Sequence, residues 1–186
     1  TMEYVDWVKA ELPCLAEAKK AKGLPAKMKA IVFADDKGGR YAWASLTSNL
    51  IYAANRIPEI ADTIVEIDNA MKWGFNFEMG PFEAWDALGV AEVVEKMEAD
   101  GMAVPEKIKK MLTLGNATFY KLEKGLRQYW DFASEAYKPL KVSANIVSLT
   151  GLKADDKLVK TCPSASLVDL GDDVYCLEFH SKMNAI

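Results

Sequence analysis

The sequence has 186 residues, 51% of them hydrophobic and 27% charged, which is enough for one folded domain with an extension. Lys and Arg number 23 against 27 Asp and Glu, and the resulting net charge of −4 argues against a general nucleic-acid binder. No apolar run approaches the roughly 20 residues that span a bilayer, and the first residues lack a leader pattern, so we expect a cytoplasmic chain without a membrane span.

The cysteine and histidine counts exclude several kinds of site. Cys14, Cys162 and Cys176 are widely spaced and odd in number, so neither a disulfide framework nor a CxxC zinc motif is expected. His180 is the only histidine, and any catalytic triad or histidine base would have to use it. We therefore expect no metal site and no catalytic residue in this chain.

Apolar spacing predicts helices over the first two thirds of the chain. Val5, Val8 and Leu12 share one helical face up to Pro13, and a second short helix should end at Gly23. Further helices are predicted over residues 27–34, 41–55, 58–72, 81–88, 90–99 and 106–114, with a loop at 35–39 and a tight, buried aromatic turn at 73–82.

From residue 118 the pattern is typical of strands. One hairpin is predicted over 118–132 and another over 165–179, and 133–163 should be a linker with little core of its own. Because an isolated two-stranded hairpin is marginal in water, we expect the chain to be cut after Ile186. Thr1 before Met2 suggests a cut at the front as well.

Two stretches resemble known enzyme families. The chain resembles the C-terminal helical domain of 3-hydroxyacyl-CoA dehydrogenases at residues 55–58, 67–75 and 79–90, and the signature of that domain is matched from Asp68 to Gly89. Residues 111–120 are similar to the last segment of the same domain. This resemblance covers about residues 24–120. Residues 165–179 and 182–186 resemble the opening hairpin of a crotonase (enoyl-CoA hydratase) domain. Prokaryotic β-oxidation enzymes fuse the two modules in this order, so the chain resembles a central piece of such a fused enzyme.

The resemblance implies an all-α, multi-helical domain of the 3-hydroxyacyl-CoA dehydrogenase C-terminal (6-phosphogluconate dehydrogenase C-terminal-like) type. A short β-hairpin extension and a truncated C-terminal hairpin would follow it. The implied divisions are residues 1–120 for the helical domain, 121–163 for the hairpin and linker, and 164–186 for the start of the crotonase domain.

The implied function is a non-catalytic part of an NAD-dependent dehydrogenase that converts 3-hydroxyacyl-CoA to 3-oxoacyl-CoA in fatty acid β-oxidation. The chain has no G-x-G-x-x-G fingerprint for NAD. Trp43 and Ala44 follow Gly39 where the catalytic copy of the domain carries a substrate-contacting Asn, so the resemblance favours the second, duplicated copy. That copy would serve packing, dimerisation and the substrate cleft. Its partners would be acyl-CoA, the Rossmann and crotonase domains of the same polypeptide, and a second copy in a homodimer. The alternative is a stand-alone helical module that binds acyl-CoA or dimerises.

Few residues are candidates for a site. By resemblance, Lys182, Asn184 and Ala185 would contact CoA. Every other candidate also has a purely structural interpretation, which we favour: His180 at a hairpin end, and Asp68 and Asp86 bonding backbone or Trp N–H groups. The same holds for a solvated carboxylate face (Glu59, Asp62, Glu66) and for a basic face that could otherwise meet CoA phosphates (Lys19, Lys20, Lys22, Lys27, Lys29). It also holds for an aromatic core that could otherwise line an acyl pocket (Trp43, Trp73, Phe75, Phe77, Phe82, Trp85). The alternative for an exposed portion of this aromatic set is an inter-domain or dimer surface.

Overall fold

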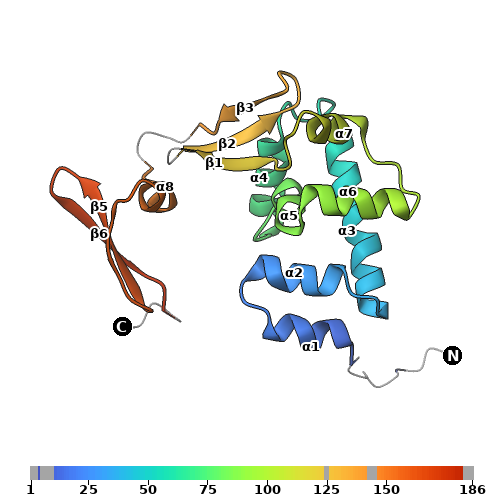
Figure 1. Ribbon diagram of the computed structural model, residues 1–186, viewed down its shortest axis with the longest axis horizontal. Helices are drawn as coiled ribbons and strands as arrows, with labels where there is room; N and C mark the ends of the chain where they lie inside the picture. Colours follow the sequence, from blue (N-terminus) through green and yellow to red (C-terminus); the bar gives the residue numbers. More distant parts are fainter. Residues whose placement is uncertain (1–3, 5–10, 124–125, 142–145, 182–186) are drawn as a thin grey trace. The chain divides into compact units, whose positions relative to one another are not determined.

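The computed structural model describes residues 4, 11–123, 126–141 and 146–181. The chain forms two compact units that divide between Phe119 and Tyr120. Helices α1 to α7 belong to the first unit, and α8 with all the described strands belongs to the second (Figure 1). Val5 and Val8, predicted to lie on a helical face, fall outside the described residues.

The first unit consists of helices joined by short loops. They are α1 (Pro13–Lys20), α2 (Leu24–Val32), α3 (Lys37–Asn55), α4 (Ile64–Phe75), α5 (Pro81–Leu88), α6 (Val90–Ala99) and α7 (Glu106–Thr113). Pro13 and Pro81 open α1 and α5 at positions where the missing N–H costs nothing. Thr63 and Glu66 form a capping box at the start of α4. Except for the start of α4, these helices lie where the sequence predicts helices, with ends that differ by a few residues.

Helix α5 is the centre of the core in this unit. Phe82, Trp85 and Leu88 on α5 are 0% exposed, and the helix packs against α2, α3, α4 and α6. Burying a side chain of this kind stabilises the fold by about 1.5–3 kcal/mol relative to leaving it in water. Other large, fully buried side chains of the unit are Leu50, Ile64, Met97, Ile108, Met111 and Phe119.

The predicted loop at 35–39 is shorter than expected because α3 begins inside it. The Asp36 carboxylate accepts hydrogen bonds from the backbone N–H groups of Gly39 and Cys14, each at 2.7 Å, and so joins the starts of α3 and α1. Gly39 lies in the first turn of α3, where a Cβ atom would be 2.0 Å from the carbonyl oxygen of Ala34. This close approach, rather than a flexible loop, explains the second glycine of the pair.

The Asp36 contacts predict an acid-sensitive link between α1 and α3. The N–H groups of Cys14 and then of Gly39 hold the pKa of Asp36 below its ordinary value. A depressed folded-state pKa adds stability that is complete above the unfolded pKa and is lost as the pH falls through the folded one. We expect the difference in melting temperature between the wild-type chain and Asp36→Asn to be constant near neutral pH and to shrink below about pH 4. A difference that grows on acidification would contradict this account.

Two predicted boundaries in the first unit are wrong. Helix α4 starts at Ile64 and not near Pro58, because residues 56–60 form turns that contain a cis Ile57–Pro58 peptide bond. Ile60 therefore lies outside the helix and is 69% exposed. The segment after α4 is also not the buried turn that was predicted, since α4 continues to Phe75 and most aromatic residues there face solvent.

The second unit contains two antiparallel three-stranded sheets. Strands β1 (Tyr120–Glu123), β2 (Leu126–Asp131) and β3 (Ala136–Pro139) form the first sheet, with β2 in the middle. Trp130 pairs with Tyr137 across β2 and β3, and their rings meet edge to face at 5.2 Å between centroids. The first predicted hairpin is thus confirmed, but a third strand occupies part of the expected linker.

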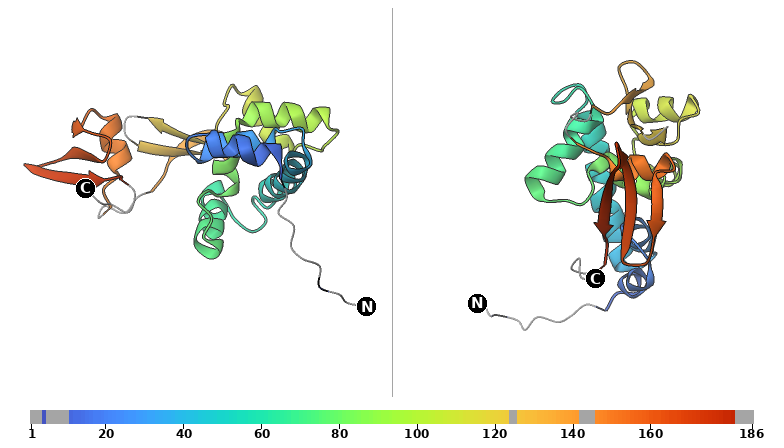
Figure 2. Two further views of the ribbon diagram at one scale, coloured as in Figure 1. Left: turned by 90° about the horizontal axis from the view of Figure 1, so that it is seen from below. Right: turned by 90° about the vertical axis from the view of Figure 1, so that its left-hand side faces the viewer.

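The second sheet is built from β4 (Leu158–Thr161), β5 (Ala165–Gly171) and β6 (Val174–Phe179), and α8 (Leu149–Ala154) packs against β5 (Figure 2). Gly171, Asp172 and Asp173 all have positive φ angles in the turn that joins β5 to β6. The predicted hairpin is therefore present, but it is not unpartnered, because β4 pairs with β5. The description all-α is correct for the first unit and wrong for the whole chain.

Candidate functional site

The signature segment connects α4 to α5 through one buried carboxylate. Asp68 on α4 is 1% exposed. Its two oxygens accept hydrogen bonds from the backbone N–H groups of Phe82, at 2.9 Å, and Glu83, at 3.2 Å. These N–H groups belong to the first turn of α5 and have no partner within that helix. Asp68 thus caps α5 from a neighbouring helix, which confirms the structural interpretation of this residue.

Gly80 and an ion pair complete this junction. A Cβ atom on Gly80 would lie 2.4 Å from Cα, Cβ and Oδ1 of Asp68, so only glycine lets the two segments come this close. The Glu83 carboxylate accepts from the Gly80 N–H at 3.1 Å and pairs with Lys72 at 2.9 Å. Both side chains of that pair are largely shielded from solvent. We refer to Asp68, Lys72, Gly80 and Glu83 as the α4–α5 clamp.

The second signature aspartate holds the end of the helical unit. Asp86 on α5 accepts a hydrogen bond from the backbone N–H of Phe119 at 2.7 Å. The Phe119 ring lies 5.0 Å from the ring of Phe82 and 5.5 Å from that of Trp85, measured between centroids. Both signature aspartates therefore bond backbone N–H groups, and α5 anchors the segment that leads out of the unit.

The aromatic candidates separate into two groups. Trp43, Phe82 and Trp85 are buried, which confirms the core interpretation for them. Trp73, Phe75 and Phe77, at the end of α4 and just beyond it, are 81%, 69% and 53% exposed. The rings of Phe75 and Phe77 lie 6.1 Å apart between centroids. Trp73 lies two residues before Phe75 on α4, so these two side chains point in different directions. We refer to the three exposed residues together as the aromatic patch.

Three candidate carboxylates, Glu59, Asp62 and Glu66, line one small, open pocket at the start of α4, but two of them already have partners within the fold. Glu59 pairs with Arg56 at 2.6 Å, and Glu66 serves the cap of α4. Asp62 is exposed. No group of three or more His, Cys, Asp or Glu side chains that could hold a metal ion occurs among the described residues.

His180 follows β6 and has a structural partner. Its Nε2 atom is 3.0 Å from the hydroxyl of Ser166, which is itself 2.9 Å from the hydroxyl of Thr161. This arrangement joins three neighbouring segments at one end of the second sheet and agrees with the hairpin-end interpretation. Lys182, Asn184 and Ala185, the candidates for a CoA contact, lie outside the described residues.

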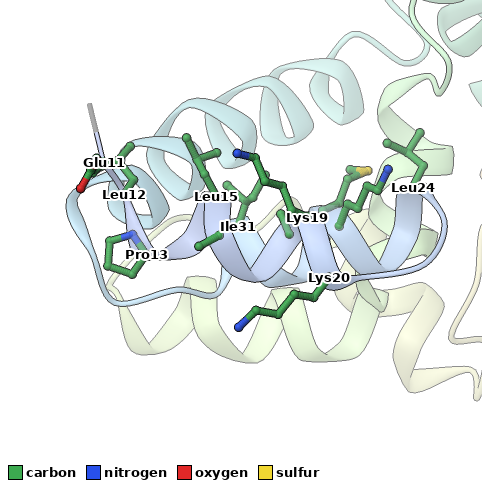
Figure 3. A pocket seen from close by; sticks show the side chains of 12 residues that line it. Glu11, Leu12, Pro13, Leu15, Lys19, Lys20, Leu24 and Ile31 are labelled. Atoms are coloured by element: carbon green, nitrogen blue, oxygen red, sulfur yellow. The ribbon is translucent and has the colours of Figure 1, made fainter. Parts of the chain in front are cut away.

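A groove that the sequence did not predict lies along α1 and α2 (Figure 3). It is open to solvent and has a volume of about 1110 Å³. Its apolar lining comes from both helices and includes Leu12, Leu15, Leu24, Met28 and Ile31. Three candidate lysines border it: Lys19, Lys20 and Lys27. The apolar residues had looked like ordinary core positions, and only the pairing of the two short helices leaves them partly uncovered.

The other basic candidates do not join this groove. Lys22 is not among its lining residues, and Lys29 pairs with Glu92 at 3.5 Å. Within the groove, Lys20 pairs with Glu17 at 2.6 Å, and Figure 3 shows it extending in a different direction from Lys19. The predicted basic face is therefore divided, and part of it borders an apolar surface.

Comparisons with known proteins find similarity mainly in the helical part of the chain. Residues 46–129 match the family model described as 3-hydroxyacyl-CoA dehydrogenase, C-terminal domain. The match starts later than the expected residue 24 and includes the first strands of the second unit. No solved structure matches the chain significantly.

Two curated relatives agree with the family model. A Bacillus subtilis (strain 168) protein provisionally named 3-hydroxyacyl-CoA dehydrogenase is 46% identical over all 186 residues, which make up 23% of its own length. A Rickettsia felis (strain ATCC VR-1525 / URRWXCal2) protein provisionally named fatty acid oxidation complex trifunctional enzyme is 27% identical over 97 residues, 50% of this chain and 13% of that protein. The chain thus spans less than a quarter of each relative.

Proposed function

We propose that this chain, which matches the 3-hydroxyacyl-CoA dehydrogenase C-terminal domain model over residues 46–129, is the helical support domain of an enzyme that oxidises 3-hydroxyacyl-CoA to 3-oxoacyl-CoA in fatty acid oxidation. The main support is the identity of 46% over the whole chain with the B. subtilis relative. In this proposal the chain is not catalytic alone. It packs against the catalytic domain and forms one side of the substrate cleft.

The signature residues have structural roles, as expected for a domain that supports the catalytic domain. Asp68 and Asp86, the two carboxylates of the signature, bond backbone N–H groups of the fold. A general base needs an acceptor within hydrogen-bond reach of substrate, and both these carboxylates already serve internal donors. The signature thus explains how this helical unit is held together rather than how a substrate is oxidised.

The residues of this chain do not fit the nicotinamide cofactor that such an enzyme uses. A dinucleotide site of the usual kind needs a parallel βαβ unit with a glycine-rich turn after its first strand. The sequence has no G-x-G-x-x-G, and the strand pairs of the described residues are antiparallel. We therefore place NAD on another part of the enzyme in this proposal and derive no step of the reaction from this chain.

The aromatic patch is the surface that we assign to packing. Trp73, Phe75 and Phe77 expose more than half of their surface, and covering such rings is among the strongest contributions to an interface. We propose that the patch contacts either the catalytic domain of the same polypeptide or a second copy in a homodimer.

The location that we propose for the enzyme is the cytoplasm. Separately, no helix among the described residues has the length and hydropathy needed to cross a membrane.

A fused hydratase is a further part of the proposal. The R. felis relative carries a trifunctional name, and the second sheet contains the hairpin whose sequence resembles the start of a crotonase domain. In this proposal residues 164–186 begin that domain. The alternative, a stand-alone helical module that binds acyl-CoA or dimerises, would instead leave the isolated chain with its complete function.

The test combines two assays of NADH formation from 3-hydroxybutyryl-CoA. The 186-residue chain alone should form no NADH. A chimera in which this chain replaces the aligned segment of the B. subtilis relative should oxidise the substrate, if that relative does, because 46% identity preserves the packing surfaces. NADH formation by the isolated chain, or a folded chimera without activity beside an active parent, would contradict the proposed role.

A further inference from the structure

The groove between α1 and α2 combines an apolar floor with two lysines that form no ion pair within the part of the chain that the structure describes. Leu15 is 42% exposed, and Leu24, Met28 and Ile31 are each partly exposed. Apolar side chains from two adjacent helices thus share one uncovered surface, which an apolar ligand would remove from water.

Lys19 and Lys27 stand at this surface with their charge unneutralised. Neither forms an ion pair with a carboxylate of the described residues, whereas Lys20 and Lys29 do. An anion next to the two unpaired ammonium groups would gain electrostatic attraction without breaking an existing pair. The ligand that complements this surface is therefore an amphiphile with one anionic headgroup.

The residues that line the groove also restrict which anionic headgroup the ligand can have. No aromatic residue for stacking a base occurs among the described residues that line the groove. Its one acidic residue, Glu11, lies immediately before the α1 segment. A small carboxylate needs only the two ammonium groups, whereas a nucleotide headgroup would need further contacts.

The length of the two helices limits the length of the ligand. Since α1 has 8 residues and α2 has 9, a rise of about 1.5 Å per residue makes the apolar surface roughly 12–14 Å long.

We propose that the α1–α2 groove binds a medium-length fatty acid anion, with the chain along Leu15, Met28 and Ile31 and the carboxylate between Lys19 and Lys27. The proposal goes beyond the dehydrogenase role and does not depend on it. It gives the helical unit a binding site for a fatty acid.

The test is a titration of the 186-residue chain with laurate below its micelle concentration. The binding constant is measured by calorimetry, and the methyl resonance of Met28 reports whether the ligand enters the groove. We expect saturable binding with a shift of this resonance, and dodecanol should bind about three- to tenfold more weakly because it lacks the charge. The double variant Lys19→Gln/Lys27→Gln should lower laurate affinity by a similar factor and leave dodecanol binding unchanged.

Matched variants separate the groove from general electrostatics and from misfolding. Lys37→Gln/Lys141→Gln removes two exposed charges outside the lining and should bind laurate as the wild type does. Leu15→Ser changes a partly exposed side chain and should weaken laurate and dodecanol equally. Equal binding of laurate and dodecanol, an unshifted Met28 resonance, or full affinity in the Lys19/Lys27 variant would overturn the proposal. Binding of lauroyl-CoA that is tighter than that of laurate and lost in the Lys19/Lys27 variant would also overturn the assignment to a carboxylate. None of these results changes the expectation for NADH formation by the chimera.

Discussion

Replacing Asp68 by Ala should destabilise the helical unit by about 3 kcal/mol, because the loss of one partner leaves buried groups unsatisfied. The carboxylate is 1% exposed and accepts from two N–H groups of α5, Phe82 and Glu83. After the change, the buried N–H of Phe82 and the part-buried N–H of Glu83 would both lose this carboxylate as an acceptor. Urea unfolding followed by the circular dichroism of the helices measures the difference in free energy of unfolding.

Two further variants separate the capping role from the loss of a charge. Asp68→Asn keeps one oxygen acceptor but puts an amide donor beside a second N–H, so it should lose part of the stability and less than Asp68→Ala. Asp62→Ala removes the same charge from an exposed site and should change stability by no more than about 0.5 kcal/mol. If Asp68→Ala and Asp62→Ala were equally mild, the clamp would not hold α5 as described.

The sequence predicts the local elements well because their signals are local. Proline at the first position of α5 and the positive φ angle of Gly89, which ends that helix, each act within one turn of helix. The hairpin of β5 and β6 is equally local, since its turn residues adopt the left-handed conformations that such turns need. The structural roles of Asp68 and Asp86 follow from the same signature pattern.

Long-range pairing accounts for what the sequence did not predict. Strand β4 is fully exposed along its length and carries no alternating apolar face, so only its pairing with β5 makes it a strand. The aromatic patch was expected to be buried because large rings usually are. Trp73 is exposed in this chain, and a packing partner elsewhere in the enzyme would reconcile its residue type with its position. The α1–α2 groove likewise depends on which faces of two helices remain uncovered, and apolar periodicity alone does not show this.

Two of the glycines in the signature, Gly74 and Gly80, should respond in opposite directions to the same substitution. Gly80→Ala should lower the free energy of unfolding by about 3 kcal/mol, because the new Cβ would lie 2.4 Å from the backbone and side chain of Asp68. Backbone strain does not contribute, since the φ angle of Gly80 is −77°, which any residue adopts. The cost would therefore come only from forcing α4 and α5 apart.

Gly74→Ala is the matched control for this substitution. Gly74 lies within α4, and an added Cβ would meet nothing within 4 Å. Alanine has the higher helix propensity and restricts the unfolded chain, so the variant should gain about 0.5–1 kcal/mol. Urea unfolding of the two variants beside the wild type measures both effects in one experiment. A nearly neutral Gly80→Ala would mean that the two helices can separate without cost, and the α4–α5 clamp could then not be the reason for glycine at this position. A destabilised Gly74→Ala would instead contradict the open surroundings of this glycine.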